Sequence, residues 1–236
     1  MLKQIKSPNF LIKSCLLFIA MNPFLRAFGQ SEDKLGSWYI YNGFFNVSPK
    51  VELFFDTQVR TYEVISNKET FLLRPYFNYN FTPTFQAGLG LEYHKNWTYS
   101  EDPDEKESFY EFRITLQSIL SQKVDRVSIQ HRYRYEFRNF EEQNLQRMRY
   151  RIQLTVPINN KTVQKGTIFM NMYDEIMVNT NPEFSLNQNW LYFAGGYQIT
   201  KSLNFQFGYL LISRTSTTYN RLQFFLTQKL YFYDKK

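Results

Sequence analysis

Cysteine is almost absent from this sequence: its 236 residues include one, Cys15, along with 2 His, 9 Gly and 8 Pro. A single cysteine excludes a disulfide framework and a cysteine-based metal cluster. The low glycine and proline content excludes collagen-like and linker-like chains. Aromatic residues, by contrast, are abundant, since 24 Phe, 18 Tyr and 3 Trp make up 19% of the chain. With 43% hydrophobic and 21% charged residues, the chain is too apolar for disorder and long enough for one sizeable domain.

The first 30 residues differ from the rest of the chain. Three lysines precede an uninterrupted apolar run from Cys15 to Met21, and Ala27 and Gly29 are small residues at the spacing that a signal peptidase reads. The sequence therefore predicts an export signal at 1–29 and a mature domain at 30–236. A retained membrane anchor is the weaker alternative, because the run falls well short of the roughly 18 residues that a spanning helix needs. Cys15 stands at the start of the apolar run rather than after it, which argues against a lipoprotein.

The net charge of +7 depends partly on this leader. Residues 1–30 hold four basic side chains and no acid, so the mature chain keeps 24 basic and 21 acidic residues, a net charge of +3. Its basic residues are matched by nearby acids or alternate with aromatics. We therefore expect no nucleic-acid partner.

From about Leu35 onward the dominant pattern has period two, which is typical of strands with two different faces. Most of the segments with this pattern exceed the five or six residues usual in soluble proteins and reach the length of a tilted membrane-spanning strand. Eleven segments can be marked, at roughly 35–46, 50–62, 69–80, 84–97, 108–120, 123–138, 143–158, 164–179, 187–199, 202–214 and 217–233.

The connections suggest two different rims. Short turns are expected at 47–49, 81–83, 122–123 and 200–201, and longer polar loops at 98–107, 139–142 and 179–186. Short turns on one rim and long loops on the other are typical of outer-membrane barrels. The predicted fold is thus all-β, a single antiparallel transmembrane β-barrel of about 10–12 strands. Because single-chain bacterial barrels usually have an even number of strands, we expect that one segment is split or missed.

Alternation sorts the side chains into two faces. The face predicted to contact lipid includes Val51, Leu53, Phe55, Val59, Phe71, Leu73, Phe77, Tyr79, Phe85, Ala87, Leu89, Leu91, Tyr93, Met148, Tyr150, Ile152, Leu154, Val156, Leu203, Phe205, Phe207, Tyr209 and Leu211. The opposite face is densely charged, which a soluble carrier barrel with an apolar interior would not need. The charged residues predicted to face inward are Glu52, Asp56, Arg60, Arg74, Glu92, Glu111, Arg113, Arg126, Arg132, Arg134, Glu136, Arg138, Arg147, Arg149, Arg151, Glu175, Arg221 and Lys229. Trp38, Trp97, Trp190, Tyr231 and Tyr233 near strand ends fit interfacial girdles, with ordinary packing as the alternative.

Arginine dominates the predicted lumen. A hairpin turning at 140–141 would place Arg132 opposite Arg149 and Arg134 opposite Arg147, with Glu111 beside Arg132, Glu175 beside Arg149 and Glu136 diagonal to Arg147. Like charges across a ladder destabilise it, and these carboxylates would relieve the repulsion. The predicted lumen charge network comprises Glu111, Arg132, Arg134, Glu136, Arg147, Arg149, Arg151 and Glu175.

Two interpretations of this lumen stay open. In one, the charged residues form a salt-bridge plug that fills a small barrel. In the other, they form an anion site or path, because the inward set holds twelve basic residues, Arg126 among them, against six acids.

Several segments resemble a known family. The segments Gly36-Ser37-Trp38-Tyr39, Leu72-Leu73-Arg74-Pro75, 130–136 and Tyr173-Asp174-Glu175 are similar to the domain-of-unknown-function 2490 family, and the likeness covers nearly the whole mature chain. At Asp174 the sequence departs from the Asn usual in the family. The resemblance implies an outer-membrane β-barrel of a Gram-negative bacterium. It implies no substrate and no catalytic residue.

The end of the chain also points to the outer membrane. Leu230-Tyr231-Phe232-Tyr233 resembles the aromatic carboxy-terminal signal of outer-membrane barrels, although Asp234-Lys235-Lys236 follows it. The expected partners are therefore outer-membrane lipid, lipopolysaccharide and the barrel-assembly machinery. The sequence does not indicate an oligomeric state.

Catalytic chemistry has little support in the sequence. Only His94 and His131 offer imidazole bases, and neither precedes a serine by two residues, as a phospholipase A-like site requires. A rim site of His94 with Ser100 or Ser108 and Glu101 is the alternative. No His pair, Cys pair or EF-hand loop indicates a metal site, and the acidic loop 101–105 is either solvated or in contact with lipopolysaccharide-bridging cations. We therefore predict no catalytic residue, no cofactor and no metal.

Three function classes follow from these patterns. The first is a narrow or plugged barrel that binds or passes small anions. The second is a structural or assembly component of the outer membrane, and the third is a lipid-modifying enzyme.

Overall fold

The computed structural model describes residues 35–100 and 105–234 of the chain. The predicted export signal at 1–29 and most of the acidic loop at 101–105 lie outside the described residues. Within them the chain is all-β, as predicted, with eleven strands and no helix. No described helix is therefore long and apolar enough to cross a membrane.

The strands follow one another closely along the sequence, and most of their bounds lie within a few residues of those predicted. They are β1 (Gly36–Asn46), β2 (Val51–Thr61), β3 (Lys68–Asn80), β4 (Phe85–Tyr99), β5 (Lys106–Val124), β6 (Val127–Asn139), β7 (Asn144–Pro157), β8 (Ile168–Asn181), β9 (Ser185–Gln198), β10 (Leu203–Ser213) and β11 (Thr218–Tyr231).

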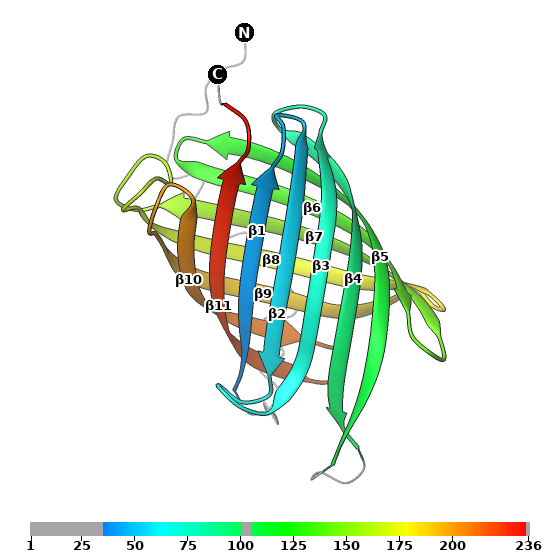
Figure 1. Cartoon of the computed structure of the whole chain (residues 1–236). Coiled ribbons are helices and arrows are strands. Elements are labelled where there is room, and N and C mark those ends of the chain that lie inside the picture. The colour runs from blue at the N-terminus through cyan, green and yellow to red at the C-terminus, as the bar shows by residue number, and fades with distance from the viewer. Residues whose placement is uncertain (1–34, 101–104, 235–236) are drawn as a thin grey trace.

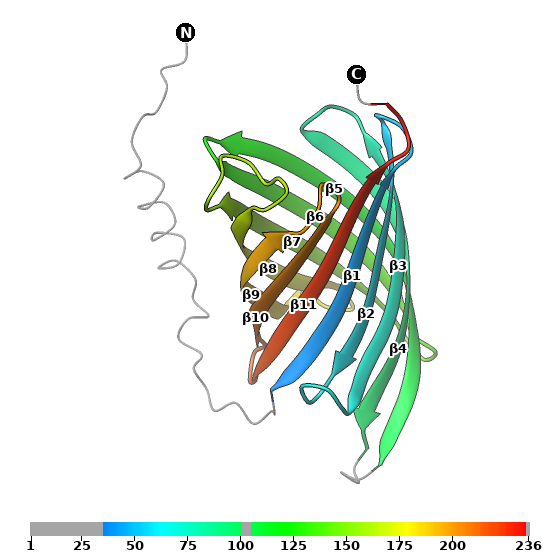
Figure 2. The ribbon, with the colours of Figure 1, turned by 60° about the vertical axis from the view of Figure 1, so that its left-hand side comes forward.

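The eleven strands form one closed barrel in which every strand pairs with its neighbours in sequence, and β11 returns to β1. Ten of the pairs are antiparallel. The closing pair, β1 with β11, is parallel over eleven residue pairs from Gly36–Arg221 to Asn46–Tyr231, and the two strands lie side by side in Figures 1 and 2. The expectation of an even strand number is therefore wrong: an up-and-down chain of eleven strands begins and ends in the same direction, so closure requires one parallel pair.

The predicted division into one rim of short turns and one rim of long loops is wrong. The longest described connection, 158–167 between β7 and β8, lies on the same rim as the short connections 47–50 and 81–84, whereas 182–184 on the opposite rim is short. The turn expected at 122–123 is also wrong, because β5 continues to Val124 and turns through Asp125 and Arg126. Asp125 has a positive φ of 54°, a conformation that tight hairpins need and that Asp tolerates.

The two faces follow the predicted alternation. None of the residues assigned to the apolar outer face is buried, and Phe77, Leu91 and Phe207 are 53%, 58% and 46% exposed. The charged set mostly lies inside, with Glu52, Glu92 and Arg74 buried. Two exceptions are Arg126, which lies exposed in the β5–β6 turn, and Lys229, which is exposed near the end of β11. The barrel is therefore apolar outside and mainly polar inside, the reverse of a soluble carrier.

Part of the interior is nevertheless apolar. Strands β1 and β8–β10 contribute a buried hydrophobic cluster on one side of the lumen, formed by Trp38, Ile40, Tyr173, Met177, Trp190, Tyr192, Ala194, Leu210 and Ile212. The inward positions of Trp38 and Trp190 show that their assignment to interfacial girdles is wrong. The alternative, ordinary packing, holds for both residues.

Candidate functional site: the charged lumen

All eight residues of the predicted charge network point into the barrel. They come from four consecutive strands, because side chains of one parity on each strand face the lumen. Their positions are Glu111 on β5; Arg132, Arg134 and Glu136 on β6; Arg147, Arg149 and Arg151 on β7; and Glu175 on β8.

Arg149 joins two buried carboxylates. Its Nη1 lies 2.7 Å from Glu136 Oε1, and its Nε and Nη2 each lie 3.0 Å from Glu175 Oε1. Glu136 also accepts hydrogen bonds from Arg147 Nε and Nη2, at 2.8 and 2.6 Å. Arg132 Nη2 reaches Glu175 Oε1 at 2.9 Å. Such charge-assisted, multidentate bonds restrict the geometry of their partners.

The pairing across the β6–β7 hairpin differs from the predicted one. The register places Arg132 opposite Arg151, Arg134 opposite Arg149, and Glu136 directly opposite Arg147. The connection spans 140–143, so the hairpin is centred one residue later than expected, and this shifts every pair by two positions. The predicted Arg132–Arg149 and Arg134–Arg147 pairs, and the diagonal position of Glu136, are therefore wrong. The predicted position of Glu175 beside Arg149 is wrong too, because Glu175 lies opposite Arg151 and contacts Arg149 diagonally. Like charges still meet across this ladder, and Glu175 from β8 compensates them.

Glu111 has different partners from those predicted. Instead of lying beside Arg132, it accepts hydrogen bonds from Arg113 Nε at 2.6 Å and from Arg138 Nε at 2.6 Å. Arg113 Nη1 also lies 3.7 Å from a Glu92 oxygen and 3.8 Å from a Glu136 oxygen, so it connects the Glu111 group to the rest of the network. Beyond the predicted set, the network thus extends to Arg113, Arg138 and Glu92. The signal for them was present in the sequence, since all three belong to the charged inward face.

Glu92 is the centre of a second buried group. It accepts hydrogen bonds from Tyr76 and from Thr115 Oγ1, the latter at 2.9 Å, and its Oε2 lies 3.0 Å from His94 Nε2. His94 is only 3% exposed, so the rim position that the enzyme alternative assigned to it is wrong. Together with the buried pair of Arg74 and Asp56, these groups fill the barrel section around β2–β5.

Two arginines of the network have no carboxylate partner among the described residues. Arg134 donates to Gln117 Oε1 at 3.1 Å and lies over the ring of Tyr76, at 4.8 Å. Arg151 reaches Gln130 Oε1 at 3.4 Å and lies 5.2 Å from the ring of Tyr173. Amides and aromatic rings hold both guanidinium groups in place, and neither forms a direct ion pair with a described carboxylate, although Arg151 lies opposite Glu175 in the β7–β8 register. Arg134 therefore has the less compensated charge of the two.

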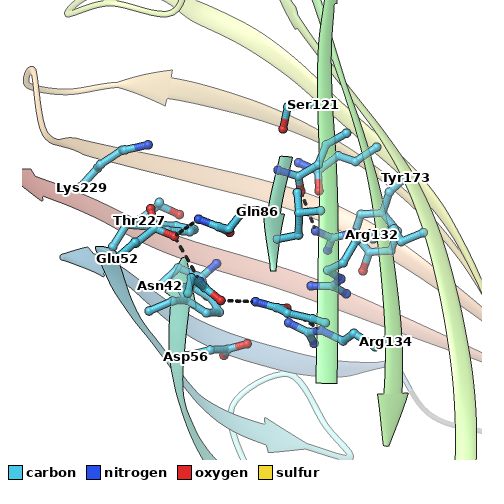
Figure 3. A pocket seen from close by; sticks show the side chains of 18 of the residues that line it. Asn42, Glu52, Asp56, Gln86, Ser121, Arg132, Arg134, Tyr173, Thr227 and Lys229 are labelled. Atoms are coloured by element: carbon cyan, nitrogen blue, oxygen red, sulfur yellow. Dashed lines mark hydrogen bonds between the residues drawn. The ribbon is translucent and has the colours of Figure 1, made fainter. Parts of the chain in front are cut away.

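Both of these arginines line a cavity of about 850 Å³ in one half of the lumen. The cavity extends from mid-barrel to the rim formed by the connections 47–50 and 81–84 and the end of β11, where its lining residues are exposed. Figure 3 shows Arg132, Arg134, Glu52 and Lys229 around it. Seven basic and three acidic side chains line the cavity: Lys50, Arg74, Arg132, Arg134, Arg149, Arg151 and Lys229, and Glu52, Asp56 and Glu175.

The inner end of the cavity is closed by aromatic and charged side chains. The rings of Trp38 and Trp190 meet edge to face with their centroids 5.1 Å apart, Arg60 lies 3.6 Å from the centroid of Trp38, and Arg149 lies 5.2 Å from that of Trp190. Beyond this layer the lumen holds fully buried side chains, including Leu72 and Met177. The barrel is therefore open at one end and filled at the other.

No group of three or more metal-ligating side chains occurs among the described residues. His131 does not face the cavity: its ring nitrogens lie 2.9 Å from the hydroxyl of Tyr150 and 3.2 Å from the amide nitrogen of Gln122. The side chains that line the cavity carry charged groups, hydrogen-bonding groups and aromatic rings.

Comparison with known proteins identifies the family. Residues 35–223 match the model of the family described as "Protein of unknown function (DUF2490)", and the chain belongs to this family. The match spans β1 through the middle of β11 and agrees with the resemblance noted in the sequence. No curated protein and no solved structure matches the chain.

Proposed function

We propose that this protein is a bacterial outer-membrane β-barrel that binds small anions in a lumen closed at one end. The outer surface supports the membrane setting. Large apolar side chains such as Phe71, Leu89 and Phe205 are exposed along the strands, far more than water-exposed surfaces of monomeric proteins carry. A closed barrel leaves no strand edge unpaired, as lipid requires.

The observation that carries the anion-binding proposal is the excess of positive charge in the cavity. Seven basic side chains face three acidic ones, and Arg134 and Arg151 have no carboxylate partner within the described residues. A low-dielectric cavity with uncompensated arginines attracts anions and repels cations. Because the opposite half of the barrel is packed, we propose binding rather than free passage.

The membrane setting implies the partners and the location. Lipid and lipopolysaccharide would surround the apolar outer face, and the barrel-assembly machinery would insert the chain after its leader at 1–29 has directed export. We propose no catalytic role, because the lipid-modifying alternative needs His94 at a rim, where it does not lie. A purely structural role in the outer membrane remains the second candidate and is favoured by the packed half of the lumen.

Electrophysiology and ligand-induced stabilisation test the proposal together. In planar bilayers the wild-type protein should show small or no current, with anion preference where current occurs. In detergent, sulfate at constant ionic strength should raise the melting temperature, and Arg151→Gln should reduce that rise. A large, cation-selective current would refute the assignment of the lumen, and stabilisation by neither sulfate nor organic anions would favour the structural role.

A further inference from the structure

One acid in the cavity wall has no basic partner. Glu52 on β2 lines the cavity and is only 6% exposed, and its Oε1 accepts hydrogen bonds from the side-chain amides of Asn78 and Gln86, each at 3.2 Å. No basic side chain among the described residues forms an ion pair with it. Its Oε2 accepts no hydrogen bond within the described residues and keeps accessible surface, so it can be reached from the cavity. A carboxylate as buried as this one is normally paired with a cation.

Glu52 differs in this respect from the other two acids that line the cavity. Asp56, also on β2, forms an ion pair with Arg74, and Glu175 forms ion pairs with Arg132 and Arg149. The protein itself therefore compensates the charges of Asp56 and Glu175. The charge of Glu52 is left to a group that enters the cavity.

Arg134 on β6 is the basic counterpart of Glu52. It lines the cavity and is 4% exposed, and its Nε donates to Gln117. Its Nη1 and Nη2 donate no hydrogen bond within the described residues and keep accessible surface. Figure 3 shows Glu52 on one side of the pocket, and Arg132 and Arg134 on the other. The cavity thus presents buried, uncompensated charge of both signs from different strands of the barrel.

This pair of charges limits the ligand class. An inorganic anion such as sulfate pairs with Arg134 and leaves Glu52 without a cation. An ammonium group has three donors and pairs with a carboxylate, whereas the two oxygens of a carboxylate or phosphate match the planar fork of an arginine. A ligand that carries both groups compensates Glu52 and Arg134 together.

We propose that the cavity binds a small organic anion that also carries an ammonium group. Arg134 binds the carboxylate or phosphate of this ligand, and Glu52 binds its ammonium. A volume of about 850 Å³ lies within the range of pockets for small organic ligands. This assignment rests on the proposed anion-binding function and adds the ammonium group to it.

The test uses the full mature chain in a non-ionic detergent and measures affinity by calorimetry. Two pairs of probes differ in the ammonium group: glutamate with glutarate, and phosphoethanolamine with ethyl phosphate. In at least one pair the amino compound should bind about 10–100-fold more tightly, as expected for a hydrogen bond between charged groups. The pair that binds more tightly identifies the anionic group as a carboxylate, as in an amino acid, or as a phosphate, as in a lipid headgroup.

Two variants assign the contacts. Glu52→Gln keeps the size of the side chain and should abolish the preference for the amino compound, because it lowers the affinity for that compound and leaves the affinity for its partner probe unchanged. Arg134→Gln should weaken both probes of a pair by about 10–100-fold. Glu183→Gln, in the exposed connection 182–184, is the matched control and should change neither affinity. Because the two probes are compared within one variant, a general loss of stability does not affect the preference.

The outcomes separate this assignment from the function on which it rests. If the probes bind but the amino compound has no advantage in either pair, the ammonium assignment is wrong and the anion site stands. If the preference persists in Glu52→Gln, Glu52 does not bind the ammonium and the assignment is also wrong. If neither the probes nor sulfate bind, the assignment and the proposed function both fail.

Discussion

Replacement of Arg149 by methionine removes the link between two buried carboxylates. Arg149 is the only described residue that hydrogen-bonds both Glu136 and Glu175, at 2.7 and 3.0 Å. Methionine keeps an unbranched apolar side chain but lacks the guanidinium group, which lies 5.2 Å from the centroid of the Trp190 ring, so the change removes the charge, the hydrogen bonds and this ring contact. The variant therefore reports on the network itself.

The expected loss follows from what each carboxylate retains. Removing one partner of a buried ion pair costs about 3–5 kcal/mol when the other charge is left uncompensated. In Arg149→Met, Glu136 keeps Arg147 at 2.6 Å and Glu175 keeps Arg132 at 2.9 Å. We therefore expect a loss at the lower end, about 3 kcal/mol, which corresponds to a fall in melting temperature of roughly 6–12 °C for a domain of this size.

Heat-modifiable gel mobility and tryptophan fluorescence in detergent both measure this loss. Arg126→Met in the exposed turn is the matched control and should change stability by less than about 0.5 kcal/mol. A double-mutant cycle of Arg149→Met with Glu136→Gln should give a coupling free energy of about 0.5–3 kcal/mol, because the two side chains are in direct contact. If Arg149→Met is no less stable than the control, the network does not stabilise the barrel.

Three further predictions concern other parts of the barrel. Gly90→Ala places a Cβ against the Tyr76 ring and should lower the free energy of unfolding in urea by about 1–3 kcal/mol. Gly195→Ala is the control, because that position has open space and the change should not destabilise the barrel. Equal effects of the two variants would contradict the packing seen around Tyr76. Phe207→Lys, midway along β10 on the outer face, should cost about 2–4 kcal/mol in lipid vesicles, and a neutral result would argue against a membrane-embedded face. A null strain complemented with His94→Ala should have the same outer-membrane lipid composition, measured by mass spectrometry, as one complemented with the wild-type gene. If the null strain has an altered lipid composition that the wild-type protein restores and His94→Ala does not, the enzyme alternative is supported.

The faces of the barrel could be predicted from the sequence because they depend on geometry alone. Side chains on a strand alternate with a period of two, so one correct position determines the whole strand. Leu53, Phe77 and Phe207 point outward and Glu52, Asn78 and Gln206 point inward, as the alternation requires. Strand bounds were also predictable where proline lies in a turn, since Pro49 and Pro83 limit the backbone at the connections 47–50 and 81–84.

The partners within the network were harder to predict, because pairing amplifies small errors. When a hairpin is centred one residue later, the partner of each residue lies two positions later in the sequence. Arg132 therefore pairs with Arg151 instead of Arg149. Glu175 nevertheless contacts both Arg132 and Arg149, because long arginine side chains reach a diagonal neighbour, as Arg149 does, or a residue two strands away, as Arg132 does. The composition of the network was thus predictable from side-chain parity, while its individual pairs depended on a turn whose four residues carry no strong positional signal.

The division of the lumen into a packed half and a cavity has its own signal in the sequence. Strands β1, β9 and β10 carry large apolar side chains at both parities, as in Trp38-Tyr39-Ile40 and Tyr209-Leu210-Leu211. A strand that is apolar on both sides is covered on both sides, so the inward residues of these strands must pack against something within the barrel. What they pack against is one another, since nine residues gather in a single cluster. The charged strands opposite then cannot meet across the lumen along their full length. Arg134 on β6 and Arg151 on β7 line the cavity without a direct ion pair, whereas their neighbours on the same strands pair with Glu136 and Glu175. The mismatch between an apolar side and a basic side thus leaves positive charge inside the barrel.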